Sequence, residues 1–162
     1  MLILGIDPGV HCGIARYVDG TLDTMHTVAP HELLRWLDNC RETGFSKKEV
    51  ALKLVVFEDS RLQSFVWTAK MSSRNAALKI ARNLGQVDGI CAQIEAWCRE
   101  FWVPYAPISP NGKGSKMDAA AFKHLTGCTK RVNQHERDAA LVAWPYRKPY
   151  RPPRRHEQEA KQ

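Results

Sequence analysis

Two acidic side chains end two of the most apolar runs in the sequence. Asp7 follows the run at residues 2–6, and Glu58 follows the run at residues 52–57. Continuous apolar runs of this length are typical of strands that are buried on both faces. Because α/β proteins place their sites at the carboxyl ends of such strands, we expect the two carboxylates to lie close together.

A third carboxylate and a histidine occupy the last apolar segment of the chain. His135 and Asp138 are three residues apart and therefore share one face of the expected helix. Three carboxylates at one place would repel each other unless a cation lay between them. Oxygen ligands favour Mg²⁺ or Mn²⁺ over zinc. Two such ions about 4 Å apart are suited to phosphodiester hydrolysis, which is the chemistry that this residue set predicts.

Each of these residues also has an ordinary explanation. Asp7 can begin a turn, Glu58 can be a solvated strand end, and His135 can lie on a helix surface. Glu136 is expected to be the capping partner of Asn133 rather than a ligand. Taken one at a time, the ordinary explanations are favoured; only the joint order of the residues along the chain favours the catalytic one.

The remaining pattern predicts the elements that position these residues. Strands are expected at 13–18 and 21–28, joined by a hairpin at Asp19-Gly20, and a fifth strand at 102–108. Helices are expected from Pro30 to near Gly44, and at 76–100, 116–126 and 133–144. The sequence therefore predicts an α/β fold whose mixed five-stranded sheet has three antiparallel strands followed by parallel ones.

The longest expected helix has two apolar faces. One face would cover the sheet, and the other carries Gly85 and Gly89 one turn apart, with Ala92 beyond them. Small residues permit the close approach of a second helix. The other expected helices are short, so a homodimer is the preferred interpretation.

Basic residues suggest a polyanionic partner. The 162-residue chain has a formal net charge of +7, and such a charge favours encounter with nucleic acid. The expected long loop at 59–75 is of a length that is often functional. Lys116 is expected at a helix N-terminus, where backbone amides favour anions. Candidate DNA-binding residues are Arg61, Phe65, Trp67, Lys70, Arg74, Lys113 and Lys116.

The five cysteines and the chain ends carry little functional signal. An odd number of cysteines without CxxC spacing makes a zinc site or a disulfide framework unfavourable, so we expect reduced core residues in a reducing cytoplasm. No signal peptide is recognised, and no apolar run reaches the ~18 residues of a membrane span. We expect one nuclease domain at 1–146 and a basic, disordered tail at 147–162.

Five segments together resemble the RuvC family of Holliday junction resolvases over residues 1–145. They are the opening Leu4-Gly5-Ile6-Asp7-Pro8-Gly9, the strand Val55-Val56-Phe57-Glu58, the helix with Asn75-Ala76-Ala77 and Leu84-Gly85-Gln86, the segment Tyr105-Ala106-Pro107 with Lys113 and Lys116, and the closing His135-Glu136-Arg137-Asp138. GxDPG alone is a weak motif, since sugar kinases begin similarly. All five in register are a strong indication.

The resemblance implies a ribonuclease-H-like fold and a metal-dependent endonuclease that cuts branched DNA in paired, symmetric nicks. Asp7, Glu58, Asp138 and His135 would be the catalytic and metal-binding residues, with two Mg²⁺ or Mn²⁺ ions. A junction-wedging aromatic would be Phe65 or its rival Trp67. The segment after Glu58 is longer than in the bacterial enzymes, and this divergence suggests a phage-type member that accepts forks and flaps as well.

Three other functions compete with this one. The first is a ribonuclease-H-like nuclease acting on RNA or RNA–DNA hybrids, and the second is a non-catalytic protein that binds branched DNA. The intact Asp7, Glu58 and Asp138 count against the second. The third, a sugar-kinase-like phosphotransferase, is disfavoured because the chain is too short for a second domain that would enclose a nucleotide.

Overall fold

A computed structural model describes residues 1–43, 51–63, 73–111 and 116–148. Five strands form one sheet: β1 (Leu2–Asp7), β2 (Cys12–Val18), β3 (Thr21–Val28), β4 (Leu52–Glu58) and β5 (Tyr105–Ile108). The helices are α1 (Pro30–Thr43), α2 (Arg74–Glu100), α3 (Ala119–Thr126) and α4 (Gln134–Ala143), with short 3₁₀ turns η1 (Ser60–Leu62) and η2 (Trp144–Tyr146).

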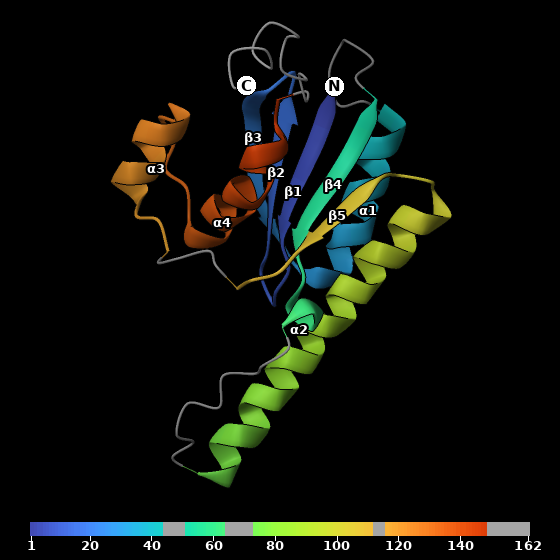
Figure 1. The fold of residues 1–162 in the computed structure, drawn as a ribbon, viewed down its shortest axis with the longest axis vertical. Helices are drawn as coiled ribbons and strands as arrows, with labels where there is room; N and C mark the ends of the chain where they lie inside the picture. Colours follow the sequence, from blue (N-terminus) through green and yellow to red (C-terminus); the bar gives the residue numbers. More distant parts are fainter. Residues whose placement is uncertain (44–50, 64–72, 112–115, 149–162) are drawn as a thin grey trace, which may run out of the picture.

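The sheet has the order β3-β2-β1-β4-β5 (Figure 1). β1 pairs antiparallel with β2, and β2 with β3, whereas β4 pairs parallel with both β1 and β5. The expected mixed five-stranded sheet, with three antiparallel strands followed by parallel ones, is therefore confirmed.

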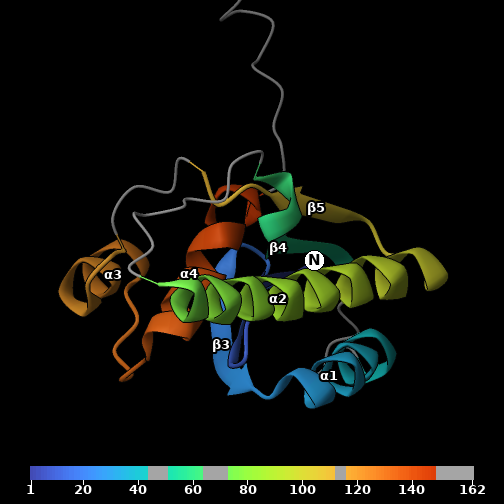
Figure 2. The same cartoon turned by 90° about the horizontal axis from the view of Figure 1, so that it is seen from below.

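Strand residues alternate between two cores, one on each face of the sheet. Leu2, Leu4 and Ile6 face the core that α1 and α2 complete, while Ile3 faces the core that α4 completes. The chain is thus a three-layer arrangement with α1 and α2 on one side of the sheet and α4 on the other (Figures 1 and 2). This alternation decides which strand residues can meet α4.

Only the second half of α2 lies in a core. Its buried residues run from Ile90 to Cys98, whereas Leu78 is 48% and Ile80 42% exposed. Figure 1 shows the first half of α2 extending past the end of the sheet, away from the rest of the molecule. No element of the described residues covers this half, so the expectation that a second copy of the chain covers the outer face of α2 stays a prediction.

Two boundaries differ from the sequence-based expectations. α3 begins at Ala119 rather than at 116, because the Asp118 carboxylate accepts hydrogen bonds from Ala120 N and Ala121 N and is itself the N-cap. Lys116 therefore precedes the cap and is not at a helix N-terminus. β5 begins at Tyr105, since the backbone of Trp102 has a φ of 54° and turns the chain between α2 and the strand.

Four of the five cysteines are buried, and all five are free thiols, as expected of core residues. Burial raises the pKa of the Cys40 and Cys91 thiols to about 11. Among the described residues, no helix has the length and apolar character needed to cross a membrane.

Candidate active site

Asp7 and Glu58 end neighbouring parallel strands. Ile6 pairs with Phe57 in the register of β1 and β4, so the two acidic residues follow side by side at the carboxyl edge of the sheet. Strand alternation places both on the face that α4 covers, because Ile3 and Val56, which have the same parity as Asp7 and Glu58, belong to that core. This register places the two strand ends side by side, as the sequence-based expectation for these carboxylates requires.

Two glycines let α4 lie directly on the strands. A Cβ added at Gly5 would be 2.1 Å from the carbonyl oxygen of Ala139, and one added at Gly13 would be 2.0 Å from the carbonyl oxygen of His135. Gly13 is the register partner of Asp7. The absent side chain at Gly13 is therefore what allows the first turn of α4 to approach the end of β1.

The start of α4 is fixed by its cap. Asn133 accepts a hydrogen bond from the Glu136 amide, and the Glu136 carboxylate accepts one from the Asn133 amide, which forms the expected capping box. The Asn133 side-chain amide also donates to the Thr27 hydroxyl at 2.8 Å, which ties the cap to β3. With the first turn held in this way, His135 and Asp138 are both directed toward the sheet edge.

The acidic groups already have polar neighbours. His135 Nδ1 lies 3.0 Å from Asp7 Oδ2. On Asp138, Oδ1 accepts a hydrogen bond of 2.7 Å from the side-chain amide of Gln134, and Oδ2 lies 3.8 Å from the ammonium of Lys116. The Asp138 side chain is 14% exposed and that of Lys116 is 73% exposed, so the lysine reaches inward from the surface.

One cavity of about 730 Å³ joins these groups. Asp7, Glu58, Lys116, His135 and Asp138 all line it. Its remaining wall is mostly apolar and includes Ile108 of β5, Met117 before α3, Leu141 and Val142 of α4, and Tyr146 of η2. The four residues that the sequence predicts as catalytic thus share one pocket, with the Lys116 ammonium at its rim.

Their chemistry fits a hard divalent cation. Three carboxylates and an imidazole offer the oxygen-rich donor set that Mg²⁺ and Mn²⁺ prefer. In the described part of the chain, however, no three His, Cys, Asp or Glu side chains converge closely enough to ligate one ion as they stand. Binding of one ion by Asp7, Glu58 and Asp138 together therefore requires side-chain rearrangement within the cavity.

Two residues of the site were missed from the sequence. Arg137 donates to the backbone carbonyls of Val132 (2.8 Å) and Met117 (3.3 Å) and to the side-chain oxygen of Gln134 (2.6 Å). Gln134 in turn donates to Asp138. Helical spacing of three and four residues could have indicated the contacts of Gln134 with Arg137 and with Asp138. Only the fold places the Met117 carbonyl within reach of Arg137.

Cys12 lies beside the site, but it takes no part in the polar contacts that join the site's strand ends to α4. Burial raises the pKa of its thiol, and the nearby Asp7 carboxylate raises it as well. The protonated thiol donates to the Gly9 carbonyl oxygen at 3.1 Å. It is therefore a buried polar group of the turn after β1 and not a reactive nucleophile.

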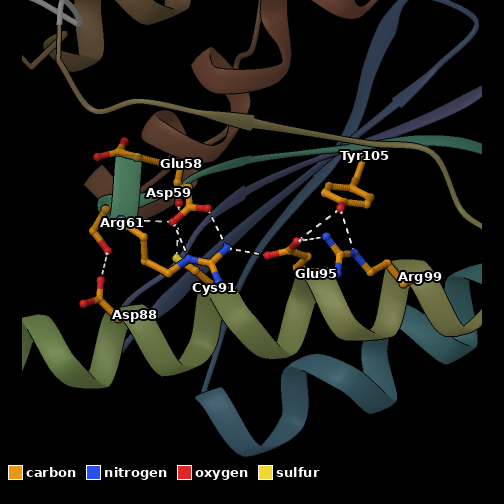
Figure 3. Close-up of polar contacts among 9 residues, drawn as sticks. Glu58, Asp59, Arg61, Asp88, Cys91, Glu95, Arg99 and Tyr105 are labelled. Carbon is orange, nitrogen blue, oxygen red and sulfur yellow. Dashed lines mark hydrogen bonds and ion pairs between the residues drawn. The ribbon is translucent and has the colours of Figure 1, made fainter. Parts of the chain in front are cut away.

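The other predicted site residues lie in several places. Arg61 lies in η1 with its guanidinium between the carboxylates of Asp59 and Glu95 (Figure 3). Arg74 is the exposed first residue of α2. The predicted interface residues Gly85, Gly89 and Ala92 are exposed on α2, two of them with open space around the position of a Cβ. Phe65, Trp67, Lys70 and Lys113 lie outside the described residues.

The strand order, the placement of α4 and the cavity at the carboxyl edge define a ribonuclease-H-like fold. Among solved structures the chain is similar to RuvC of T. thermophilus in complex with a Holliday junction substrate, with a TM-score of 0.56 and 17% identity over 89% of this chain and 91% of that one. No protein-family model matches the sequence, and no curated protein matches it. At this identity the likeness establishes the fold, which is that of RuvC.

Proposed function

We propose that the chain is a metal-dependent endonuclease that cuts branched DNA, four-way junctions above all. The observation that carries the proposal is the shared cavity, in which Asp7, Glu58 and Asp138 meet His135 at the carboxyl edge of the sheet. The RuvC-like fold supports it, and so does the junction bound to the T. thermophilus protein.

Asp7, Glu58 and Asp138 would hold two divalent cations. When bound, these ions supply positive charge that favours a hydroxide nucleophile and a departing 3′ oxygen. The protein's own residues bind and orient the substrate. Lys116, at the rim of the cavity and largely exposed, would exchange its contact with Asp138 for one with a phosphate of the substrate.

His135 is suited to proton transfer. With a proton on Nδ1 donated to Asp7, the Nε2 atom is the one that can accept a proton. Its side chain is 41% exposed and therefore accessible from the cavity mouth. In an alternative role, the Nε2 atom of the same ring would be an additional metal ligand, while Nδ1 keeps its contact with Asp7.

Cutting both strands of a symmetric junction calls for two sites. We propose that the exposed first half of α2, with Leu78 and Ile80 outward and Gly85 and Gly89 open, packs against a second copy of the chain. Light scattering should give twice the chain mass. Gly85→Leu should reduce it to the single mass, and a wild-type monomer that still makes paired nicks would refute this part of the proposal.

A substrate panel tests the activity. Labelled four-way junction, fork, flap, RNA–DNA hybrid and plain duplex are incubated with Mg²⁺ or Mn²⁺ and either the wild type or Asp7→Asn. We expect the wild type to cut the branched DNA, and Asp7→Asn to bind junctions with little change but not to cut them. Preferred cutting of the hybrid would favour a ribonuclease, and binding without cutting by the wild type would favour a non-catalytic junction binder.

A further inference from the structure

One face of α2 carries acidic residues toward the turn that follows Glu58. Asp88 and Glu95 are seven residues apart and so lie on the same side of the helix. The Ser60 hydroxyl donates to Asp88 at 2.6 Å, and the Arg61 guanidinium donates to Glu95 at 2.7 Å. These two contacts, which we name the η1 clamp, attach the turn after β4 to α2 (Figure 3).

Arg61 is the centre of the clamp. Its Nε and Nη2 donate to the two carboxylate oxygens of Asp59 at 2.8 and 2.7 Å, and its backbone amide donates to the same carboxylate at 3.0 Å. The Asp59 side chain is 2% exposed. The hydrogen bond with Arg61 holds the pKa of Asp59 below its usual range. A buried carboxylate of this kind needs its cation, because a lone charge there would be strongly disfavoured.

The far side of the clamp is held as well. Glu95 also accepts from Arg99 at 2.6 Å and from the Tyr105 hydroxyl at 3.2 Å. Its carboxylate is therefore fixed between α2 and β5. Since Arg61 is engaged by two carboxylates, each fixed in place, its guanidinium is poorly available for a DNA phosphate.

Glu58 is the residue next to this network. Strand alternation directs the Glu58 side chain into the cavity and that of Asp59 toward α2, and Figure 3 shows the two pointing in opposite directions. The Asp59 amide donates to the Ile108 carbonyl at 2.9 Å, and the Cys91 thiol lies 3.5 Å from the Glu58 carbonyl oxygen. The backbone on the carboxyl side of Glu58 is thus held by both β5 and α2.

We propose that Arg61 is a positioning residue for Glu58: through Asp59 and Glu95 it fixes the end of β4, so that Glu58 meets Asp7 and Asp138 at the cation site. This inference rests on the proposed function, and it replaces the sequence-based hypothesis that Arg61 contacts DNA. Removing a residue that positions a metal ligand lowers metal affinity and turnover, whereas removing a residue that contacts a phosphate lowers DNA affinity and its salt dependence.

The test compares Arg61→Ala with Arg35→Ala, which removes the same charge from an exposed site on α1, where the ion pair with Glu32 is 3.8 Å long. Mn²⁺ affinity is measured by calorimetry without DNA, and junction affinity in Ca²⁺ is measured at several salt concentrations. For Arg61→Ala we expect Mn²⁺ affinity to fall about 10-fold or more and kcat to fall with it. Junction Kd and its salt slope should match those of Arg35→Ala.

Arg61→Lys should recover only part of the Mn²⁺ affinity, because one ammonium cannot donate in the geometry of both carboxylates. The inference is overturned if Arg61→Ala leaves Mn²⁺ affinity at the wild-type value while the salt slope of junction binding falls by about one phosphate contact. If Arg61→Ala does not fold, Mn²⁺ affinity is measured for Glu95→Gln instead, which weakens the contact of Arg61 with α2 but keeps the Asp59–Arg61 pair. Unchanged Mn²⁺ affinity of Glu95→Gln also overturns the inference. A wild type that neither binds Mn²⁺ nor cuts branched DNA would instead refute the proposed function.

Discussion

Replacing Gly13 with alanine should separate His135 from Asp7. The added Cβ would lie 2.0 Å from the His135 carbonyl oxygen and 2.5 Å from its carbonyl carbon, and real Cβ atoms essentially never approach other atoms more closely than 3.0 Å. The first turn of α4 must therefore retreat by about 1 Å. The contact between His135 Nδ1 and Asp7 is already 3.0 Å long, so a shift of that size breaks it.

The magnitudes follow from this displacement. Overpacking of this kind costs about 1–3 kcal/mol of unfolding free energy, which for a domain of this size lowers Tm by about 2–12 °C. A misplacement of about 1 Å at a catalytic group lowers kcat by about 100-fold. We therefore expect Gly13→Ala to fold at room temperature and to bind junction DNA, but to cut it about two orders of magnitude more slowly.

Thermal unfolding and single-turnover cleavage measure the two effects. Gly9→Ala is the matched control, because a Cβ there would meet nothing closer than 3.5 Å although Gly9 borders the same cavity. The control should keep both Tm and cleavage rate near the wild-type values. Wild-type behaviour of Gly13→Ala in both assays would refute the argument that close packing of α4 on β2 builds the site.

Three further predictions concern stability and reactivity. The pKa of Asp59 is depressed in the folded chain, so the stability that this group contributes is complete above the usual range of an aspartate pKa and is lost as the pH falls below it. Urea titrations at pH 5 and pH 3 should therefore show a fall in the unfolding free energy of the wild type, and a smaller fall for Asp59→Asn. Tyr17→Phe should cost about 1 kcal/mol in the same assay, since the buried hydroxyl donates to the Ala140 carbonyl of α4 at 2.8 Å, and no loss would mean that this bond is not stabilising. Cys128 alone of the five cysteines is not buried, so one thiol per native chain should react promptly with a disulfide reagent at pH 8. Cys128→Ser should abolish this prompt reaction, and prompt reaction of several thiols in the wild type would contradict the packing.

Local chemistry made much of the fold predictable. Apolar runs ending in Asp7 and Glu58 gave correct strands, and Asn133 with Glu136 gave a correct capping box, because both depend on residues close in sequence. The α3 boundary was wrong for a local reason too: Asp118 accepts two amide hydrogen bonds and begins the helix three residues later than expected.

The contacts between distant segments could not be predicted in this way. The η1 clamp joins residues 28 and 34 positions apart, and it depends on where α2 lies against the end of β4. Lys116 could be expected near a phosphate, but its contact with Asp138 depends on how α4 lies relative to the residues before α3. The two apolar faces of α2 were visible in the sequence, but its first half is exposed in the single chain, and its packing against a second copy stays a prediction.

Crystals soaked in Mn²⁺ and measured at the manganese absorption edge would show whether the carboxylates of the cavity bind divalent cations together. We expect anomalous density within the cavity, ligated by Asp7, Glu58 and Asp138, with the Lys116 ammonium displaced from Asp138. Density only at other surfaces, with the contact between Lys116 and Asp138 intact at saturating Mn²⁺, would contradict the proposed site.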